Sequence, residues 1–514
     1  MVLLSLRVQE NGDEVPVDEK EVETYGTIDY STAVPIYGSR WSGRELPKNK
    51  IPEREAPPHV VKHLIKDELA LDGNPALNLA SFVTTYMEGE ARDLLAQTAS
   101  VNLVDLEVYP QSAEISARCV NMIANLYHAP AEKGDHPAIG TSTIGSSEAV
   151  MLCVLALKRR WQFARKEKGL PIDKPNLVMG ANAQVCWHKA VRYLEIEGRE
   201  VNVTEECLYM DPKKAVEMVD ENTIGVVAIL GSTFTGHYED VKTLDKLLEA
   251  KCKKTGLDVG IHVDAASGGF VAPFINPDLE WDFRLKRVIS INVSGHKYGL
   301  VYPGVGWAIW RSKEYLPEDL IFWVNYLGTD QASFTLNFSK GSSSVIAQYY
   351  NLLRFGRAGY TRVMSNLIHI SDYIADQLVK SDQFILMSAT GGQGLPLIAF
   401  RLKHEKHYDE YDVASKIRER GWVLPAYTMA PGLEHVKMLR AVVREDMSKN
   451  RADILLRDLQ AALESLEKTD KALLQHTRDQ HKSVGHKALA KRGHHVTPET
   501  YNSQRKKLKR TQAC

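Results

Sequence analysis

Between residues 140 and 310, short apolar runs alternate with stretches of helical character. The runs read PNLVMG, TIGVVAILG, VGIHVDAAS, RVISINVSG and GVGWAIW; they are rich in β-branched residues and bounded by glycine. Short runs of this kind, separated by helices, are typical of a largely parallel sheet that is covered on both faces. The pattern therefore predicts an α/β domain.

The segments on either side of this stretch have a different character. Residues 1–76 are rich in proline and charge and weakly periodic, so we expect an N-terminal arm that does not fold alone. A large domain is expected over residues 77–367. The runs PLIAFRL, VKMLRAVVR and DILLRDLQAALESLEK predict a smaller domain of mixed α and β structure over residues 368–470. Residues 471–514 lose apolar content and are expected to form a flexible, basic tail.

Charge and cysteine content bear on the class of partner and on the compartment. The net charge of −1 gives no overall attraction to nucleic acid or to a membrane surface. The six cysteines show no CxxC spacing, which favours a reducing compartment, and no run approaches the ~18 apolar residues of a membrane helix. We therefore expect a cytoplasmic protein that binds neither membrane nor nucleic acid. The pair His494 and His495 has no cysteine or acidic partner at ligand spacing, so no metal site is expected.

The motif SGHKYG places Lys297 at the end of the apolar run VISINV. A lysine in that position loses hydration, and desolvation lowers the pKa of its amine toward a nucleophilic free base that can form an imine. The alternative is a strand-end lysine whose amine reaches water, which is the common case for an arbitrary lysine.

The motif HVDAASGGF lies 33 residues before that lysine and places Asp264 at the end of another apolar run. Pyridoxal phosphate needs a carboxylate against its pyridine nitrogen, because the protonated ring accepts electrons from a substrate carbanion. An aspartate at a strand end is, by itself, more often a helix cap or a turn residue. Together with Lys297, and with small residues following it that leave room for a flat ring, Asp264 predicts a pyridoxal phosphate site.

A third motif, GTSTIGSSEAVML, is a Gly-Ser-Ser turn that leads into an amphipathic helix beginning near Ser147. The N–H groups and the positive dipole end of a helix favour a bound phosphate, and the hydroxyls of Ser146 and Ser147 add donors. The alternative is a serine helix cap with Glu148 in the first turn.

These motifs, with NLASF, YPQSAEISARCVNMIANLYHAP, WDFRL and NFSKG, resemble those of glutamate decarboxylases, which are fold-type I, group II pyridoxal-phosphate-dependent decarboxylases. The resemblance extends over about residues 27–465. It implies a mainly parallel seven-stranded sheet in the large domain, a smaller α+β C-terminal domain, and α-decarboxylation of L-glutamate to 4-aminobutyrate and CO₂.

The resemblance also implies roles for individual residues. Lys297 matches the Schiff-base lysine, Asp264 the partner of the pyridine nitrogen, and His296 a catalytic neighbour of the cofactor. The other implied cofactor-binding residues are Ser146, Ser147, Gln184 stacked on the ring, Thr233, Ala266, and Ser339, which the neighbouring subunit would supply. A homo-oligomer with shared active sites, either a dimer or a hexamer, is therefore expected.

The implied substrate site has two parts. Arg440 resembles the arginine that holds the α-carboxylate, and the pocket for the distal carboxylate would comprise Ser81, Phe82, Asn102 and Asp105. Ser81 stands where bacterial members usually have threonine, and the bacterial C-terminal segment that closes the site has no counterpart here.

Two other functions remain open from the sequence. The chain could be a related decarboxylase acting on aspartate, cysteine sulfinate or an aromatic amino acid, or a non-catalytic scaffold of the same fold. Plant relatives bind calmodulin through the C-terminus, but the segment LAKRGHHVTPET is broken by Gly493 and Pro498, and no tryptophan follows Trp422. Calmodulin targets are amphipathic helices with large anchors, so a solvated tail is favoured over calmodulin binding.

Overall fold

The computed structural model describes residues 48–53, 55–130, 138–325 and 331–474, together with strands β1 (Arg7–Val8) and β2 (Glu14–Val15). The chain divides into two compact units, residues 1–73 and 74–514. In the first unit, β1 and β2 pair antiparallel, and helix α2 (Pro58–Leu69) follows them in sequence. Much of the expected arm, and the expected tail beyond residue 474, lie outside the described residues, so the domain boundaries stay predictions.

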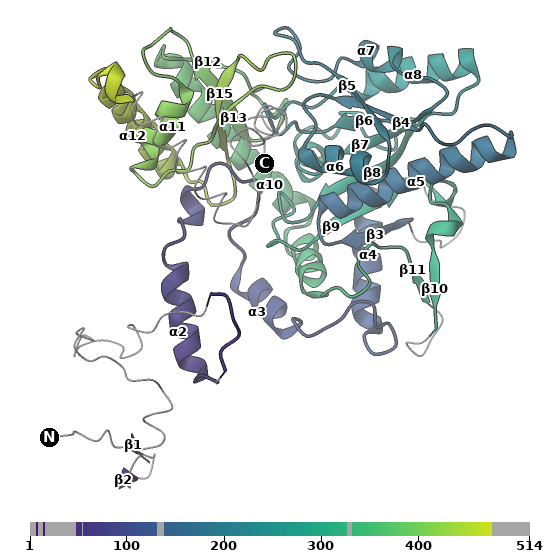
Figure 1. Ribbon diagram of the computed structural model, residues 1–514, viewed down its shortest axis with the longest axis horizontal. Coiled ribbons are helices and arrows are strands. Elements are labelled where there is room, and N and C mark those ends of the chain that lie inside the picture. The colour runs from purple at the N-terminus through teal and green to yellow at the C-terminus, as the bar shows by residue number, and fades with distance from the viewer. Residues whose placement is uncertain are drawn as a thin grey trace. The chain divides into compact units, whose positions relative to one another are not determined.

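A seven-stranded sheet organises the second unit (Figure 1). Its strand order is β3 (Gly140–Thr143), β9 (Gly306–Trp310), β8 (Val288–Ser294), β7 (Ile261–Asp264), β6 (Thr223–Ile229), β4 (Asn176–Gly180) and β5 (Glu197–Val201). Strands β4 to β8 are parallel, and β9 runs antiparallel to its neighbours β3 and β8. The predicted α/β fold with a mainly parallel seven-stranded sheet is confirmed, and each of the five apolar runs forms a strand.

Both faces of this sheet are covered by helices, which explains why its five inner strands are buried along their full length. In β4, Leu177 and Met179 pack with residues of α5 (Ser146–Glu167) and α6 (Val185–Tyr193). Val178, between them, belongs to the core on the other face, with residues of α7 (Pro212–Glu217) and α8 (Val241–Thr255). Successive side chains of a strand point to opposite faces, so burial on both sides favours an unbroken apolar run.

Further elements surround the sheet. The helices are α3 (Gly89–Gln97), α4 (Pro110–Leu126) and α9 (Ala272–Ile275); the 3₁₀ turns are η1 (Pro75–Leu77), η2 (Gly268–Phe270), η3 (Lys313–Tyr315) and η4 (Glu318–Leu320); and β10 (Phe322–Val324) pairs antiparallel with β11 (Gln331–Ser333).

The long helix α10 (Ser343–Lys380) is interrupted at Gly356, whose φ of 54° and ψ of −171° are not helical. A positive φ of this kind is readily adopted by glycine alone, so the residue allows two helical segments to meet at a kink.

The C-terminal part of the second unit is a four-stranded antiparallel sheet with helices (Figure 1). Its order is β12 (Phe384–Leu386), β13 (Leu397–Leu402), β15 (Lys437–Val442) and β14 (Ala426–Thr428), and the accompanying helices are α11 (Glu410–Arg418) and α12 (Lys449–Glu467). The apolar residues of this C-terminal part belong to the same hydrophobic core as one face of the large sheet. The predicted mixture of α and β structure is present here. None of the described helices combines the length and apolar character that a membrane span requires.

Candidate active site

A cavity of about 180 Å³ lies where several strands of the large sheet end. The carboxyl ends of parallel strands are the usual site of ligand binding in open α/β sheets. The residues that line the cavity are Ser146, Ser147, Asn182, Gln184, Cys186, Ile229, Gly231, Thr233, Asp264, Ala266, Ser267, His296 and Lys297. Eight residues that the sequence predicts to bind cofactor are therefore brought together: Ser146, Ser147, Gln184, Thr233, Asp264, Ala266, His296 and Lys297.

Lys297 enters the cavity from the turn that follows β8. Its Nζ donates a 3.1 Å hydrogen bond to Oγ of Ser267 and lies 5.5 Å from the centre of the Phe82 ring. Thr84 fastens the same turn, because its Oγ1 donates to the carbonyl of Lys297 at 2.6 Å and its N–H donates to the carbonyl of His296 at 2.9 Å. These two hydrogen bonds fix the backbone of the turn, which directs the amine into the cavity.

Asp264 ends β7, and its carboxylate is buried, with the residue only 6% exposed. Oδ2 accepts a 2.7 Å hydrogen bond from Nε1 of Trp187. Oδ1 accepts 3.0 Å hydrogen bonds from Nδ2 of Asn292 and from the backbone N–H of Ala266. Three N–H donors therefore fix the orientation of this carboxylate, and hydrogen bonds to an ionised acceptor are the stronger kind.

The N-terminus of α5 forms another wall of the cavity. The helix begins at Ser146 after Gly145, so the predicted alternative, a serine cap, is not what the structure shows. Glu148 instead reaches back from the first turn, and its Oε2 accepts a 2.8 Å hydrogen bond from the N–H of Ile144. The first N–H groups of a helix have no partner within the helix, so this end, with two serine hydroxyls beside it, suits an anion such as phosphate.

His296 is held in one tautomer beside the cavity. Its Nδ1 lies 2.9 Å from the carbonyl oxygen of Val305, which can only accept, so Nδ1 carries the proton. Burial, and then the nearby charge of Lys297, lower the pKa of His296 to about 4. The ring is therefore neutral at physiological pH, and Nε2 carries a lone pair. A Cβ on Gly145 would come within 3.2 Å of this ring, so any other residue would require the ring to shift by a few tenths of an ångström.

Arg440 lies beside the cavity on β15 and is almost fully buried. Its guanidinium donates to the carbonyl of Thr233, a cavity residue, at 2.5 Å and to the carbonyl of Ala80 at 2.6 Å. The same group lies 4.9 Å from the centre of the Phe82 ring and 5.5 Å from that of Tyr427. The structure thus brings together Arg440 and Phe82, two residues that the resemblance assigns to the substrate site.

Ser81 precedes Phe82 and is half-buried, and its Oγ accepts a 3.1 Å hydrogen bond from the N–H of Val83. Its hydroxyl is therefore fixed by the local turn.

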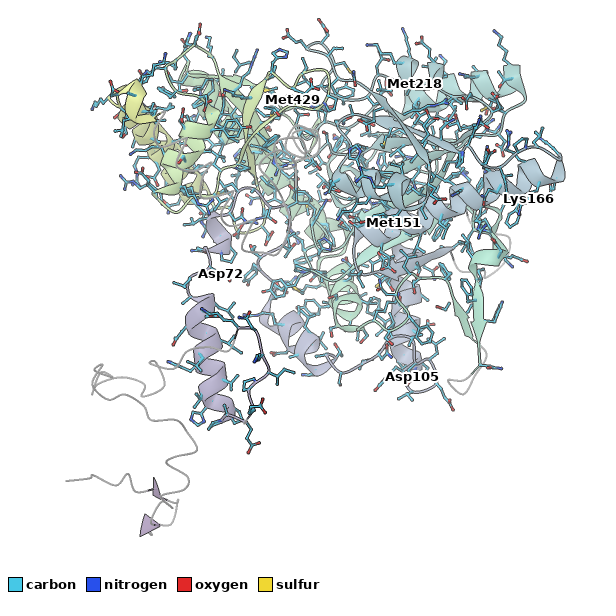
Figure 2. The ribbon with its side chains drawn as sticks, viewed as in Figure 1. Asp72, Asp105, Met151, Lys166, Met218 and Met429 are labelled. Carbon is cyan, nitrogen blue, oxygen red and sulfur yellow. The ribbon has the colours of Figure 1, made fainter. Side chains whose placement is uncertain are left out.

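Three further predicted residues lie outside the cavity lining, as Ser81, Phe82 and Arg440 also do. Ser339 lines a separate hollow of about 300 Å³. Asn102 pairs with the segment after Ser339, since its Oδ1 accepts a 3.2 Å hydrogen bond from the N–H of Lys340. Asp105 follows Asn102 in a turn and lies near the start of α4 (Figure 2). Within one chain, none of these three residues lines the cavity that Lys297 enters.

Sequence reasoning missed four residues of this region. Trp187 and Asn292 donate to Asp264, His262 is hydrogen-bonded to Asn292, and Ser267 accepts from Nζ of Lys297. One signal was available: Asn292 is a polar residue inside the apolar run VISINVS, and it lies directly opposite Asp264 in the register of β7 and β8. Trp187 gave no such signal, because a tryptophan in an amphipathic helix is normally a core residue.

The donor set fits pyridoxal phosphate. A fixed carboxylate can face the ring nitrogen, a helix N-terminus with two hydroxyls can hold the phosphate, and a primary amine can meet the aldehyde. All three groups face one cavity, with small residues such as Gly231 and Ala266 in its wall.

Comparison with known proteins agrees with this chemistry. Residues 53–403 match the pyridoxal-dependent decarboxylase conserved domain. Glutamate decarboxylase of Petunia hybrida is 54% identical over 84% of this chain and 86% of its own length, and glutamate decarboxylase of Lactococcus lactis is 45% identical over 88% and 96%. A solved structure of Lactobacillus brevis glutamate decarboxylase superposes with a TM-score of 0.81 at 42% identity, covering 85% of this chain and 99% of that one. The chain belongs to the pyridoxal-dependent decarboxylase family.

Proposed function

We propose that this chain is a glutamate decarboxylase that uses pyridoxal phosphate to convert L-glutamate to 4-aminobutyrate and CO₂. The observation that carries the proposal is that Lys297, Asp264 and the start of α5 face one cavity. Relatives named glutamate decarboxylase, 45–54% identical over most of the chain, support the choice of substrate.

Pyridoxal phosphate, when bound, supplies an aldehyde that bonds to amines and a protonated ring that accepts the electron pair left when CO₂ departs. Nζ of Lys297 would hold the cofactor and, after turnover, displace the product amine. The Asp264 carboxylate would keep the proton on the ring nitrogen, and Ser146 and Ser147 would bind the phosphate. Gln184, at the start of α6, would lie against the ring, with Thr233 and His296 beside it.

Arg440 would select which bond of the substrate breaks. A planar guanidinium can hold a carboxylate through two parallel hydrogen bonds, and its contacts with Thr233 and Phe82 fix its plane. Holding the α-carboxylate in one place orients the bond to Cα for loss of CO₂. The proton must then be delivered to Cα for the product to be 4-aminobutyrate.

The distal carboxylate pocket is proposed to be shared between two copies of the chain. Phe82, next to Ser81, lies 4.9 Å from the Arg440 guanidinium and 5.5 Å from Nζ of Lys297. Ser339 instead lines a separate hollow, Asn102 is hydrogen-bonded to Lys340 in the wall of that hollow, and Asp105 follows Asn102. Residues that a chain cannot bring to its own site can be supplied by a partner in a symmetric assembly. We therefore propose a homodimer as the active unit. A cytoplasmic location is proposed from the cysteine pattern.

The test is to incubate the purified chain and pyridoxal phosphate with L-glutamate, L-aspartate, cysteine sulfinate or an aromatic amino acid and to measure CO₂ and amine products. We expect CO₂ and 4-aminobutyrate from glutamate, and no turnover by a folded Lys297→Ala variant. A preference for another amino acid would support the alternative of a related decarboxylase. If none of the amino acids is turned over, the alternative of a non-catalytic scaffold is supported.

A further inference from the structure

A line of buried side chains extends behind Asp264, away from the cavity. Nδ2 of Asn292 lies 3.0 Å from Oδ1 of Asp264, Oδ1 of Asn292 lies 2.7 Å from Nε2 of His262, and Nδ1 of His262 lies 2.7 Å from Oγ of Ser290. His262 and Asn292 have no exposed surface, and Ser290 is 1% exposed.

The register of two neighbouring strands creates this line. His262 lies opposite Ser290, and Asp264 lies opposite Asn292, in the parallel pair β7 and β8. Residues two apart in a strand share a face, so all four side chains lie on the same side of the sheet. The group is therefore built into the most rigid part of the fold.

Each hydrogen bond in the line has a defined direction. The Asp264 carboxylate only accepts, so Asn292 must turn its N–H₂ toward it and its Oδ1 toward His262. Nε2 of His262 must then be the protonated nitrogen. Burial lowers the pKa of His262, and a neutral ring leaves a lone pair on Nδ1 that accepts from the Ser290 hydroxyl. This arrangement gives every one of these bonds a donor and an acceptor.

We propose that His262 is a positioning residue that fixes the Asn292 amide and thereby holds Asp264 oriented for the ring nitrogen of the cofactor. Without the Nε2–H donor, Oδ1 of Asn292 loses its buried partner, and the amide is free to tilt and weaken its hydrogen bond to the carboxylate. Trp187 donates to the other carboxylate oxygen at 2.7 Å and the N–H of Ala266 donates to Oδ1 at 3.0 Å, so Asn292 is one of three contacts that set the angle of the Asp264 carboxylate. This inference rests on the family's cofactor but not on the identity of the amino acid substrate.

The test compares His262→Phe with His262→Gln in the full-length chain. Phenylalanine fills the space without a donor, whereas glutamine can offer N–H to Asn292 and an oxygen to Ser290. Each variant is loaded with pyridoxal phosphate labelled with ¹⁵N at the ring nitrogen, and the ¹⁵N resonance is recorded by solid-state NMR. The control is His128→Phe. It removes a histidine that is hydrogen-bonded to Asp282, and neither His128 nor Asp282 lines the cavity.

We expect the ring-nitrogen resonance of His262→Phe to move toward that of the unprotonated ring, and that of His262→Gln and His128→Phe to stay at the wild-type position. The kcat for decarboxylation should fall about tenfold in His262→Phe, while KM changes little. A loss of this size is at the lower end of that seen when a residue supporting a metal ligand is removed. A purely structural role would lower stability and leave the ¹⁵N resonance unchanged.

A folded His262→Phe variant with the wild-type ¹⁵N resonance and kcat would overturn the proposal. If His262→Phe does not fold, Ser290→Ala, which removes one oxygen atom, replaces it. A smaller displacement in the same direction is then expected, and an unchanged resonance in folded Ser290→Ala would overturn the proposal. If the labelled cofactor binds and the resonance behaves as expected but glutamate is not decarboxylated, the proposed substrate fails and this inference stands.

Discussion

Nε1 of Trp187 donates a 2.7 Å hydrogen bond to Oδ2 of Asp264, which joins helix α6 to the end of strand β7. Gln184, the N-cap residue of the same helix, lines the cavity and accepts a hydrogen bond from the N–H of Cys186. One helical turn therefore fixes the residue proposed to lie against the cofactor ring and the carboxylate proposed to face its nitrogen.

Replacing Trp187 with phenylalanine tests this connection. The substitution keeps an aromatic ring in the core but removes one donor to a buried carboxylate, which typically costs about 1–3 kcal/mol. We expect the affinity for pyridoxal phosphate to fall roughly tenfold, as measured by titration of the apoprotein. A Trp187→Phe variant with unchanged cofactor affinity and stability would contradict this role.

The pH dependence of stability should contain a contribution from His296. Its pKa is lowered from 6.5 to about 4 by burial and by Lys297, so the unfolded chain binds more protons than the folded chain between these pH values. The stabilisation from the neutral ring is complete above about pH 6.5 and is lost as the pH falls toward 4. It amounts to roughly 3 kcal/mol.

A His296→Asn variant, which keeps a short N–H donor near Val305, provides the comparison. Melting temperatures of the two apoproteins should converge as the pH falls from 6.5 to 4. Parallel curves over that range would argue against a depressed pKa at this residue.

The kink in α10 predicts the response to an alanine at Gly356. Its φ of 54° strains any residue with a Cβ, although nothing lies within 4 Å of the position a Cβ would take. Gly356→Ala should therefore destabilise by about 1–3 kcal/mol through the backbone alone. Gly89→Ala, at a helical position with equal space and no positive φ, is the matched control and should be neutral or slightly stabilising in denaturant unfolding.

Asp105 tests the proposal of a shared substrate pocket. Because Asp105 does not line the Lys297 cavity of its own chain, Asp105→Ala should leave pyridoxal phosphate binding nearly unchanged. Its loss should raise the KM for glutamate, since the distal carboxylate would lose a partner. Equal losses of cofactor and glutamate affinity in titrations would count against this assignment.

Mixing a variant with weakened glutamate binding and an inactive variant, at a glutamate concentration below the KM of Asp105→Ala, tests the sharing directly. Chains with Asp105→Ala and chains with Lys297→Ala should regain part of the activity when co-assembled, because a mixed dimer has one site with both residues intact. Absence of any recovery in confirmed mixed dimers would place both residues in the site of one chain.

The sequence predicts the centre of this site better than its surroundings. The strand ends that carry Asp264 and Lys297 follow from apolar runs that stop at polar residues, and the start of α5 follows from its Gly-Ser-Ser turn. The role of His262, which lies inside such a run, could not be predicted, because it depends on the register between β7 and β8. That register is a property of the sheet and not of either strand.

The proposed contribution of a second chain depends on assembly and not on local sequence. Asn102, Asp105 and Ser339 are predicted by resemblance, and nothing in their own segments indicates which chain's active site they would complete.

The direction of β9 could not be predicted from its sequence either. Its apolar pattern is the same for a parallel and an antiparallel strand.

The central claim is that Nζ of Lys297 bonds to the aldehyde of pyridoxal phosphate, and reductive trapping tests it most directly. Borohydride treatment of the loaded protein, followed by digestion and peptide mass spectrometry, should place a phosphopyridoxyl group on Lys297. Lys340 is the natural competitor, because burial lowers the pKa of its amine to about 8. Label on Lys340 or on another lysine, with Lys297 unmodified, would contradict the account.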